Sequence, residues 1–410
     1  MAQVHLTLED DILKDLMLGN KESAVGKLLE QVFNSILQAQ ASEQLSAEPY
    51  ERNEDRTSYR NGYRSRTLAT RVGTLFLHIP KFRDGTFSTD LFNNYQRSEK
   101  ALILSLMEMV IQGVSTRKVS EITETLCGTN FSKSTVSGLC QELDPIVNAF
   151  QNRPLERHYP FVIVDAIYMK AREDQRIRSK GFLIAMGINE EGSREIVGFA
   201  VADSESEESW NDFFASLKTR GLSQVDLIIS DNHSGLKKAI QKQFHGTSWQ
   251  RCQTHFSKNL LDKTPKKVQS AVKTDLNDLY NAPNLKEAKA RKQRMLDEYR
   301  EQAPKAMDLL DESFDEITAV FALPEPYRKR LRTTNSIERL NEELRRRERV
   351  IRIFPNEDSM IRLMGALLME HHEKWLTGKK YFTMDCYLEE RDNARKQALT
   401  ERAEYLRVVT

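Results

Sequence analysis

The sequence predicts an α/β protein whose sheet layer is interrupted by a long helical segment. Three strand-like runs, an amphipathic helix, a buried strand and a further helix follow one another over residues 156–240. This order makes a mixed layer of sheet and helices, with the functional edge where the strands end. A charged, helix-prone stretch with little strand signal follows over 241–332. It is too long for a loop, and we expect an inserted helical domain.

Composition narrows the class of protein. The 410 residues allow two to four domains, and 39% hydrophobic with 30% charged residues fits a water-exposed, charged surface. No apolar run approaches the roughly 18 residues of a membrane span, and the N-terminus lacks a secretory pattern. Four scattered cysteines do not make a disulfide framework, so we expect a reducing, cytoplasmic setting. Because no apolar run is long enough to span a bilayer, we expect no membrane partner. The formal net charge of +1 gives no global argument for a nucleic-acid partner.

Seven segments are expected along the chain. They are an N-terminal helical arm (1–56), a small β and loop segment (57–97), a helix-turn-helix domain (98–155), the first part of the α/β layer (156–240), an all-helical insertion (241–332), the second part of the α/β layer (333–380) and a charged, peripheral tail (381–410). The arm fits either an exposed extension or a dimerising helix pair, and the sequence does not choose between them.

Arginines and aromatic residues alternate around an Asn-Gly turn near residue 60. Arg60 and Arg64 flank this turn together with Tyr59 and Tyr63. Interleaved arginines and aromatics suit contacts with nucleic-acid backbone and bases. A short loop with surface arginines explains the same residues equally well.

Three short helices are expected between residues 98 and 150. Gly113 and the run 128–130 separate them, and Ser132 is placed to cap the third. The third helix would bury Val136, Leu139, Cys140 and Leu143, and it would expose Lys133, Ser134 and Thr135 in its first turn. A short helix, a glycine-containing turn and a second helix form the pattern of a DNA-reading helix-turn-helix, although many helical bundles share it.

Two aspartates stand where apolar strand runs end. Asp165 follows the run 161–164, and Asp231 follows the buried strand 225–230. Simpler roles exist for both, because Asp231 could cap the next helix and Asp165 could mark a strand turning outward.

A helix beginning near Asn335 carries two adjoining stripes. Its buried stripe is Ile337, Leu340 and Leu344, and its polar stripe is Thr334, Glu338, Asn341 and Arg345. A polar stripe beside a buried one can face a cleft, where it would meet Asp165 and Asp231. Glu338 also lies three residues after Asn335, which is the spacing of a capping box.

The same helix is the centre of a basic region. Between Arg328 and Arg352 there are ten basic and four acidic residues, a net charge of +6. Arg328, Lys329, Arg330 and Arg332 precede the helix, and Arg345 lies on it. The region fits either a solvated charged face or a track for phosphates.

Three converging carboxylates repel one another unless cations intervene. Oxygen ligands of this kind select Mg²⁺, with Mn²⁺ as a substitute. Two such ions about 3.5–4 Å apart can clamp a phosphate that is being cut. Asp165 would then bridge both ions, Asp231 and Glu338 would each hold one, and Arg345 or Arg339 could neutralise the phosphate.

Several motifs together resemble the mutator-type transposases of bacterial insertion sequences. The motifs are Arg60-Asn61-Gly62-Tyr63-Arg64, Val164-Asp165-Ala166, Ser230-Asp231-Asn232-His233-Ser234-Gly235-Leu236, Trp249-Gln250-Arg251-Cys252-Gln253-Thr254-His255-Phe256 and Asn335-Ser336-Ile337-Glu338-Arg339-Leu340-Asn341. The resemblance runs from about residue 57 to about residue 375. No single motif is specific to this family, but the five motifs together are.

The resemblance implies a ribonuclease-H-like catalytic domain with an Asp-Asp-Glu triad, interrupted by an all-helical insertion. It also implies an N-terminal DNA-binding region that recognises the terminal inverted repeats of an element, with target DNA as a second partner. Because transposition brings two ends together, we expect at least two copies of the chain in one complex, as a homodimer. The expected setting is the bacterial cytoplasm, at the nucleoid.

Cys252 and His255 form a Cys-x-x-His pair that the resembled family repeats at this place. A zinc site normally needs four ligands, and no second pair follows at finger spacing. The pair is expected near the active site together with Asn341, in a structural role or in contact with a DNA strand. Two packed residues at a junction of helix and sheet explain it equally well.

Two other classes of protein fit parts of this pattern. A related metal-dependent nuclease would cut DNA without joining strands, and the triad alone does not separate it from a transposase. A non-enzymatic DNA-binding regulator would retain the helix-turn-helix, but it would not need the three acids.

Overall fold

The computed structural model describes residues 21–51, 56–70, 72–85, 87–89, 100–112, 114–127, 131–394 and 396–397. The chain divides into two compact units, residues 1–142 and 143–410, which are treated separately below. None of the described helices is long and apolar enough to cross a membrane.

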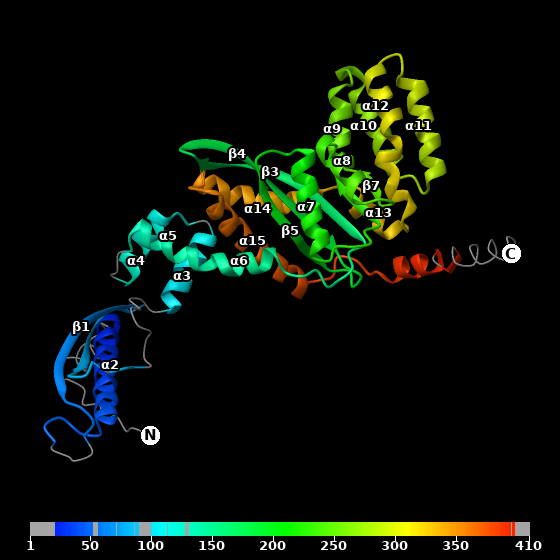
Figure 1. The fold of residues 1–410 in the computed structure, drawn as a ribbon. Coiled ribbons are helices and arrows are strands. Elements are labelled where there is room, and N and C mark those ends of the chain that lie inside the picture. Colours follow the sequence, from blue (N-terminus) through cyan, green and yellow to red (C-terminus); the bar gives the residue numbers. More distant parts are fainter. Residues whose placement is uncertain are drawn as a thin grey trace. The chain divides into compact units, whose positions relative to one another are not determined.

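In the first unit, one helix packs on a two-stranded ribbon (Figure 1). The helix is α2 (Lys21–Leu45), and the antiparallel strands are β1 (Arg60–Thr70) and β2 (Gly73–Phe82). Asn34 of α2 accepts from the backbone N–H of His78 at 2.8 Å and donates to the Phe76 carbonyl at 3.2 Å, so it covers the edge of β2. The expected arm is therefore part of a folded layer over the described residues; residues 1–20 and 52–55 lie outside them.

Three helices follow in the same unit, as expected. They are α3 (Lys100–Ile111), α4 (Thr116–Cys127) and α5 (Lys133–Cys140), and their shared core includes Leu106, Val119 and Val136. The predicted cap is confirmed, because Ser132 Oγ accepts from the Thr135 backbone N–H at 3.1 Å. The expected glycine breaks at Gly113 and 128–130 lie outside the described residues.

The second unit is built on a five-stranded mixed sheet in the order β5-β4-β3-β6-β7. The strands are β3 (Phe161–Glu173), β4 (Arg176–Ile188), β5 (Arg194–Ala202), β6 (Leu227–Ser230) and β7 (Ser248–Arg251). The pairs β3–β6 and β6–β7 are parallel, whereas β3–β4 and β4–β5 are antiparallel. The mixed α/β class is confirmed.

Edge strand β7 corrects the expectation that residues 241–332 hold helices alone. The strand is only four residues long, and Gln250 and Arg251 are polar side chains that the fold buries. A short run with buried polar side chains shows neither the alternation nor the apolar composition of a strand.

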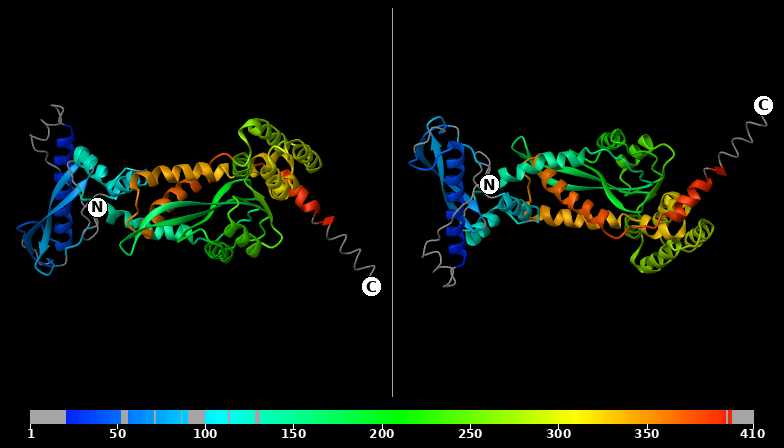
Figure 2. Two further views of the ribbon diagram at one scale, coloured as in Figure 1. Left: turned by 90° about the horizontal axis from the view of Figure 1, so that it is seen from above. Right: turned by 90° about the horizontal axis from the view of Figure 1, so that it is seen from below.

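Helices cover both faces of the sheet (Figure 2). On one face α7 (Glu207–Thr219) and α8 (Ser234–Gln243) close a core that includes Val162, Leu183 and Trp210. Helices α14 (Asn335–Ile351) and α15 (Glu357–Thr377) cover the other face, and α6 (Asp144–Gln151) packs against α15. Side chains alternate along β3, so Val162 and Val164 belong to the first face and Asp165 to the second.

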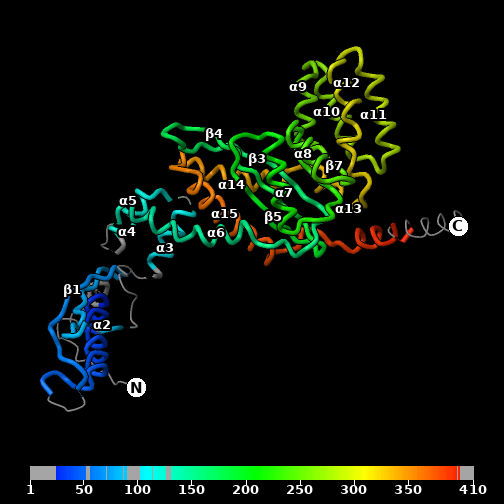
Figure 3. The backbone as a smooth tube through the Cα atoms, in the orientation of Figure 1, coloured from blue at the N-terminus to red at the C-terminus, as the bar shows by residue number. Residues whose placement is uncertain are grey.

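Between β7 and α14 the chain forms a helical bundle, which can be followed in Figure 3. Its members are α9 (Gln253–Asp262), α10 (Lys266–Tyr280), α11 (Leu285–Tyr299), α12 (Pro304–Thr318), a 3-10 turn (Ala319–Ala322) and α13 (Glu325–Leu331). Helices α9 to α12 and the 3-10 turn enclose their own core, which includes Leu276, Leu296 and Leu310.

The first part of the tail is packed rather than peripheral, which corrects the expectation for residues 381–410. Tyr387 is 6% exposed, and its ring lies 4.8 Å from that of Phe161 on β3. Tyr327 donates its hydroxyl to the Thr383 carbonyl at 2.6 Å. Residues 395 and 398–410 lie outside the described part of the chain.

Candidate active site and nucleic-acid surfaces

Asp165 and Asp231 are brought level by the parallel pairing of β3 and β6. Ile163 pairs with Ile229, and continuing this register by two residues places Asp165 opposite Asp231. Asp231 directly follows β6, as expected. Asp165 does not end its strand, because β3 continues to Glu173 along β4 after its pairing with β6 stops. The apolar run of β3 stops at Asp165 because the neighbouring strand β6 ends at that level. Beyond it β3 keeps its pairing with β4 and lacks β6 on its other edge.

Helix α14 supplies the third carboxylate, and both predicted stripes are confirmed. Ile337, Leu340 and Leu344 are buried. On the polar stripe, Asn341 donates from Nδ2 to Asp165 Oδ2 at 2.7 Å. This bond ties α14 directly to β3, so Asn341 faces Asp165, whereas Arg345 of the same stripe is exposed.

The sequence also allowed Glu338 and Asp231 to be helix-capping residues, and the structure does not give them that role. The N-cap of α14 is Thr334 rather than Asn335, and Asn335 instead accepts at Oδ1 from the Thr254 hydroxyl at 3.3 Å. The N-cap of α8 is His233, although Asp231 Oδ1 does accept from the His233 backbone N–H at 3.3 Å. Neither acid is therefore the capping residue of its helix.

The pKa of Asp165 is raised by its surroundings. Burial is the largest cause, and the Asp231 and Glu338 charges add to it. The Ala166 backbone N–H and His255 oppose the shift, and the pKa still rises to about 7. A site whose carboxylate resists ionisation in this way favours a cation.

Cys252 and His255 lie beside Glu338. His255 Nε2 is 3.9 Å from Glu338 Oε1, and Cys252 is fully buried. Contact with Cys252, followed by the Glu338 and Asp165 charges, outweighs burial and raises the pKa of His255 to about 9. Burial raises the pKa of the Cys252 thiol, but interactions with His255 and Thr334 outweigh it and hold that pKa below the usual value.

A fourth acid, Glu205, escaped the sequence reasoning. Its carboxylate is mostly buried, with Oε1 3.6 Å from His233 Nδ1. Burial raises its pKa, His233 opposes the rise, and the charge of Asp231 adds to it. Glu205 lies in an acidic run between β5 and α7, where no periodicity distinguishes it from its neighbours.

The basic residues before α14 divide into two kinds. Arg328 donates to the carbonyls of Leu323 (2.7 Å) and Pro283 (2.8 Å), and Arg332 donates to the Tyr280 carbonyl at 3.0 Å. Arg330 donates to the Tyr381 carbonyl. These three arginines donate to backbone carbonyls of the protein itself, although Arg330 is also exposed. Lys329 before α14 and Arg345 on α14 are exposed.

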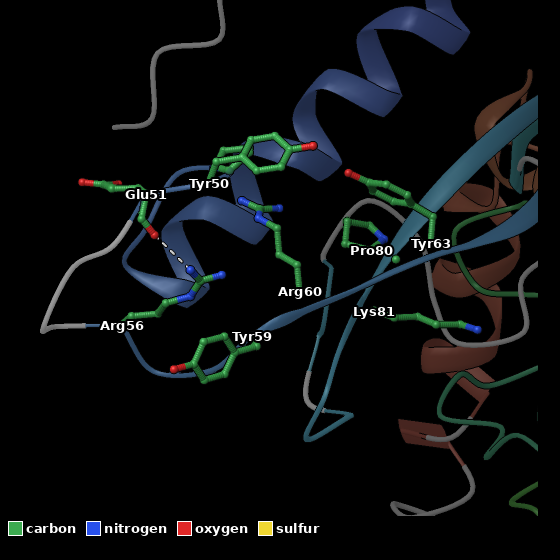
Figure 4. A pocket seen from close by; sticks show the side chains of 10 residues that line it. Tyr50, Glu51, Arg56, Tyr59, Arg60, Tyr63, Pro80 and Lys81 are labelled. Atoms are coloured by element: carbon green, nitrogen blue, oxygen red, sulfur yellow. Dashed lines mark hydrogen bonds between the residues drawn. The ribbon is translucent and has the colours of Figure 1, made fainter.

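The predicted Asn-Gly turn is wrong, because Asn61 and Gly62 lie within β1 at a register irregularity where Gly62 has a positive φ of 73°. The residues around them line an open groove of about 1050 Å³ in the first unit (Figure 4). Exposed rings of Tyr50, Tyr59 and Tyr63 stand at its walls, and the Arg56 guanidinium lies 4.9 Å from the Tyr59 ring. Arg60 donates to the Ser42 hydroxyl at 2.8 Å and so ties the groove to α2. Arg64 is exposed on β1 outside this lining.

Lys133, Ser134 and Thr135 are all exposed at the start of α5, as expected for a recognition helix. The Thr135 hydroxyl is 2.8 Å from Ser132 Oγ, so part of its bonding capacity is used within the cap.

A mixed sheet with clustered carboxylates, together with basic and aromatic surfaces, is typical of proteins that process nucleic acids. The chain belongs to the Mutator family of transposases, whose family model matches residues 1–378.

Three curated relatives illustrate this membership. A transposase for insertion sequence element IS256 in transposon Tn4001 from Staphylococcus aureus is 45% identical over 94% of this chain and 100% of that protein. A transposase for element ISRM5 from Rhizobium meliloti is 42% identical over 94% of this chain and 97% of its own. A transposase for element IS1081 from Mycobacterium tuberculosis is 38% identical over 94% of this chain and 93% of its own.

Among solved structures, a chain of the simian T-cell lymphotropic virus intasome in complex with a PP2A regulatory subunit matches 44% of this chain and 69% of its own. The identity is 9% and the TM-score 0.16, too low to support any conclusion about the fold.

Proposed function

We propose that this protein is the transposase of an insertion sequence, which binds the terminal inverted repeats and catalyses metal-dependent cleavage and transfer of DNA strands. The observation that carries the proposal is the level placement of Asp165 and Asp231 on paired parallel strands, beside a helix whose Asn341 bonds Asp165 and whose Glu338 acts on the pKa of Asp165. Membership of the Mutator family supports the reaction. We place this activity in the bacterial cytoplasm, at the nucleoid.

The donor atoms fit a divalent cation held by oxygen. Asp165, Asp231 and Glu338 would bind Mg²⁺, or Mn²⁺ as a substitute. Asn341 is 6% exposed, and its Oδ1 has no hydrogen-bond partner among the described residues, so an amide oxygen is also left unsatisfied at the site. When bound, the metal would supply positive charge to activate the attacking oxygen and to stabilise the leaving one.

The protein's own side chains would hold this geometry. Asn341 orients the Asp165 carboxylate through its 2.7 Å hydrogen bond. His255 Nε2 lies 3.9 Å from Glu338 Oε1, and contact with Cys252 together with the Glu338 and Asp165 charges raises the pKa of its ring to about 9. Arg345 is exposed two turns further along α14, where it would contact a DNA phosphate.

The fold supports a ribonuclease-H-like assignment interrupted by a helical insertion. Asp165 lies on the central strand of a mixed sheet, Asp231 directly follows its parallel neighbour β6, and a bundle with its own core separates β7 from α14. Recognition of DNA would fall to α5, through Lys133, Ser134 and Thr135, and to the ribbon carrying Arg60 and Arg64. Basic residues and exposed tyrosines in the groove suit the phosphates and bases of DNA.

Substitution of the triad tests the proposal. Asp165→Asn, Asp231→Asn and Glu338→Gln each keep the side-chain shape and remove one charge from the site. Each variant should lose cleavage of a labelled element end by at least a thousandfold while keeping its affinity for that end. The proposal would be falsified if Glu338→Gln cut DNA near the wild-type rate in Mg²⁺.

A pre-cut element end separates a transposase from a nuclease. Wild-type protein should join the free 3′ end to target DNA when Mg²⁺ is added, and the triad variants should not. Cleavage without joining would support a nuclease, and DNA binding without either activity would support a regulator.

A further inference from the structure

A buried contact between Cys252 and Thr334 joins the two elements that carry Asp231 and Glu338. The Cys252 backbone N–H donates to the Ser230 carbonyl at 2.7 Å, immediately before Asp231. The Cys252 side chain meets Thr334, the N-cap of the helix that carries Glu338. Both Cys252 and Thr334 are 0% exposed. Cys252 therefore contacts both the residue before Asp231 and the N-cap of the helix that carries Glu338.

The sulfur takes a position that a glutamate often occupies. In a capping box a glutamate near the helix start accepts from the backbone N–H of the N-cap residue. Here the Thr334 backbone N–H is directed at Cys252 Sγ, at 3.4 Å. With that donor satisfied by sulfur, the Glu338 carboxylate meets the hydroxyl of the N-cap residue and not its backbone N–H.

Thr334 also sets where the Glu338 carboxylate lies. Thr334 Oγ1 is 2.8 Å from Glu338 Oε1 and 3.2 Å from Cys252 Sγ. A hydroxyl has one hydrogen, so a threonine that donates to the carboxylate can accept from the thiol through its oxygen. Hydrogen bonds then connect Cys252 to Thr334 and Thr334 to Glu338 Oε1. The second carboxylate oxygen of Glu338, Oε2, takes no part in them.

We propose that Cys252 and Thr334 are positioning residues that hold the Glu338 carboxylate toward Asp231 and Asp165 for metal binding. This inference rests on the proposed metal centre. Cys252 acts by accepting from the cap of α14, and it is not itself a ligand. Groups that orient a metal ligand typically change metal affinity by about ten- to a hundredfold when they are removed.

Mn²⁺ titration of the full chain, followed by the electron paramagnetic resonance of free Mn²⁺, tests the inference without relying on catalysis. Cys252→Ala and Thr334→Val should each weaken Mn²⁺ binding roughly tenfold. Cys252→Ser, which restores a polar acceptor, should recover most of the loss. Thr264→Val is the matched control, because Thr264 is a buried threonine whose hydroxyl donates to the Leu260 carbonyl at 2.8 Å, at the far end of α9. It should lose stability without losing Mn²⁺ affinity.

The outcomes separate this inference from the proposed function. Loss of Mn²⁺ binding in Asp165→Asn, with wild-type affinity in folded Cys252→Ala and Thr334→Val, would overturn the positioning role alone. If Cys252→Ala does not fold, Thr334→Val decides the question. Wild-type protein that binds no Mn²⁺ would overturn the metal centre and this inference together.

A metal ligand role for Cys252 is the alternative to exclude. Ligand atoms of Cys252, His255 and Glu338 all lie within 4.8 Å of one another. A cobalt–thiolate absorption band that appears when Co²⁺ is added to wild-type protein, and that disappears in Cys252→Ala, would show direct ligation and would overturn the positioning role. We expect no such band, because the Thr334 backbone N–H is already directed at the sulfur and the thiol faces Thr334 Oγ1.

Discussion

Asp165 is the residue whose ordinary chemistry the fold changes most clearly. It lies within a strand, it accepts from Asn341, and it faces the charges of Asp231 and Glu338. Burial and these charges favour the protonated form of Asp165, whereas an aspartate exposed to water is ionised at neutral pH. In the absence of metal, the folded chain therefore gains stability when Asp165 holds a proton.

This leads to a pH-dependent difference in stability between Asp165→Asn and the wild type. The pKa of Asp165 is raised from 3.8 to about 7 in the folded chain, so its stabilising protonation is complete below the unfolded value and is lost as the pH rises through about 7. In EDTA, Tm should favour Asp165→Asn increasingly from about pH 4 to about pH 7, and the difference should then level off. Thermal unfolding of both proteins across this range measures it.

A Tm difference that stays constant across the range would contradict the raised pKa. Adding Mg²⁺ at pH 8 gives an independent check. The metal should raise the Tm of the wild type and should leave Asp165→Asn nearly unchanged, because the variant has lost a charged ligand.

At the scale of single elements, helices α5 and α14 present polar residues in opposite ways. Helix α14 directs Glu338 and Asn341 inward to the carboxylate site, with Asn341 buried. Helix α5 buries Val136 and Cys140 and leaves its first turn exposed. The first arrangement suits chemistry, and the second suits contact with a partner.

Replacing Lys133 and Thr135 with alanine should weaken binding to a specific element end more than binding to random DNA. Residues at the start of a recognition helix meet base edges, and each lost base contact is worth about 1–3 kcal/mol. Fluorescence anisotropy with both duplexes at one salt concentration measures the ratio. Lys118→Ala, an exposed lysine on α4, serves as the control. Equal losses on the two duplexes would reduce α5 to a non-specific contact.

For the whole molecule, salt dependence shows which basic residues contact DNA. Lys329 and Arg345 are exposed, whereas Arg328 and Arg332 donate to backbone carbonyls of the bundle. Lys329→Gln and Arg345→Gln should each lower the log–log salt slope of duplex binding by about 0.9 per lost phosphate contact. Lys286→Gln, an exposed lysine at the start of α11, should leave the slope unchanged. Slopes equal to the wild type in all three variants would remove this region from the DNA path.

Assembly is the second property of the whole molecule. Joining two ends of one element requires two sites of chemistry, so the complex with end DNA should contain at least two protomers. Light scattering of the complex, with the free chain as reference, measures the number. A complex of one protomer that nevertheless joins both ends would rule out the dimer.

The sequence by itself determined the features that depend on neighbours along the chain. The two stripes of α14 follow from a helical period of about 3.6 residues, and the Ser132 cap depends on residues three positions apart. The order of strands and helices between Phe161 and Gln243 was predictable for the same reason. The position of Asp231 directly after a buried strand was predictable in the same way, whereas Asp165 proved to lie within β3 and not at its end.

Only the tertiary structure decided which distant residues meet. The contact of Cys252 with Thr334 joins positions 82 residues apart, and the carbonyls that occupy Arg328 and Arg332 lie 45 and 52 residues from them. Strand β7 exists because β6 offers it an edge, and Tyr387 is buried because Phe161 lies beneath it. Period and composition record local geometry, whereas these contacts depend on packing between elements, which leaves no repeated pattern along the chain.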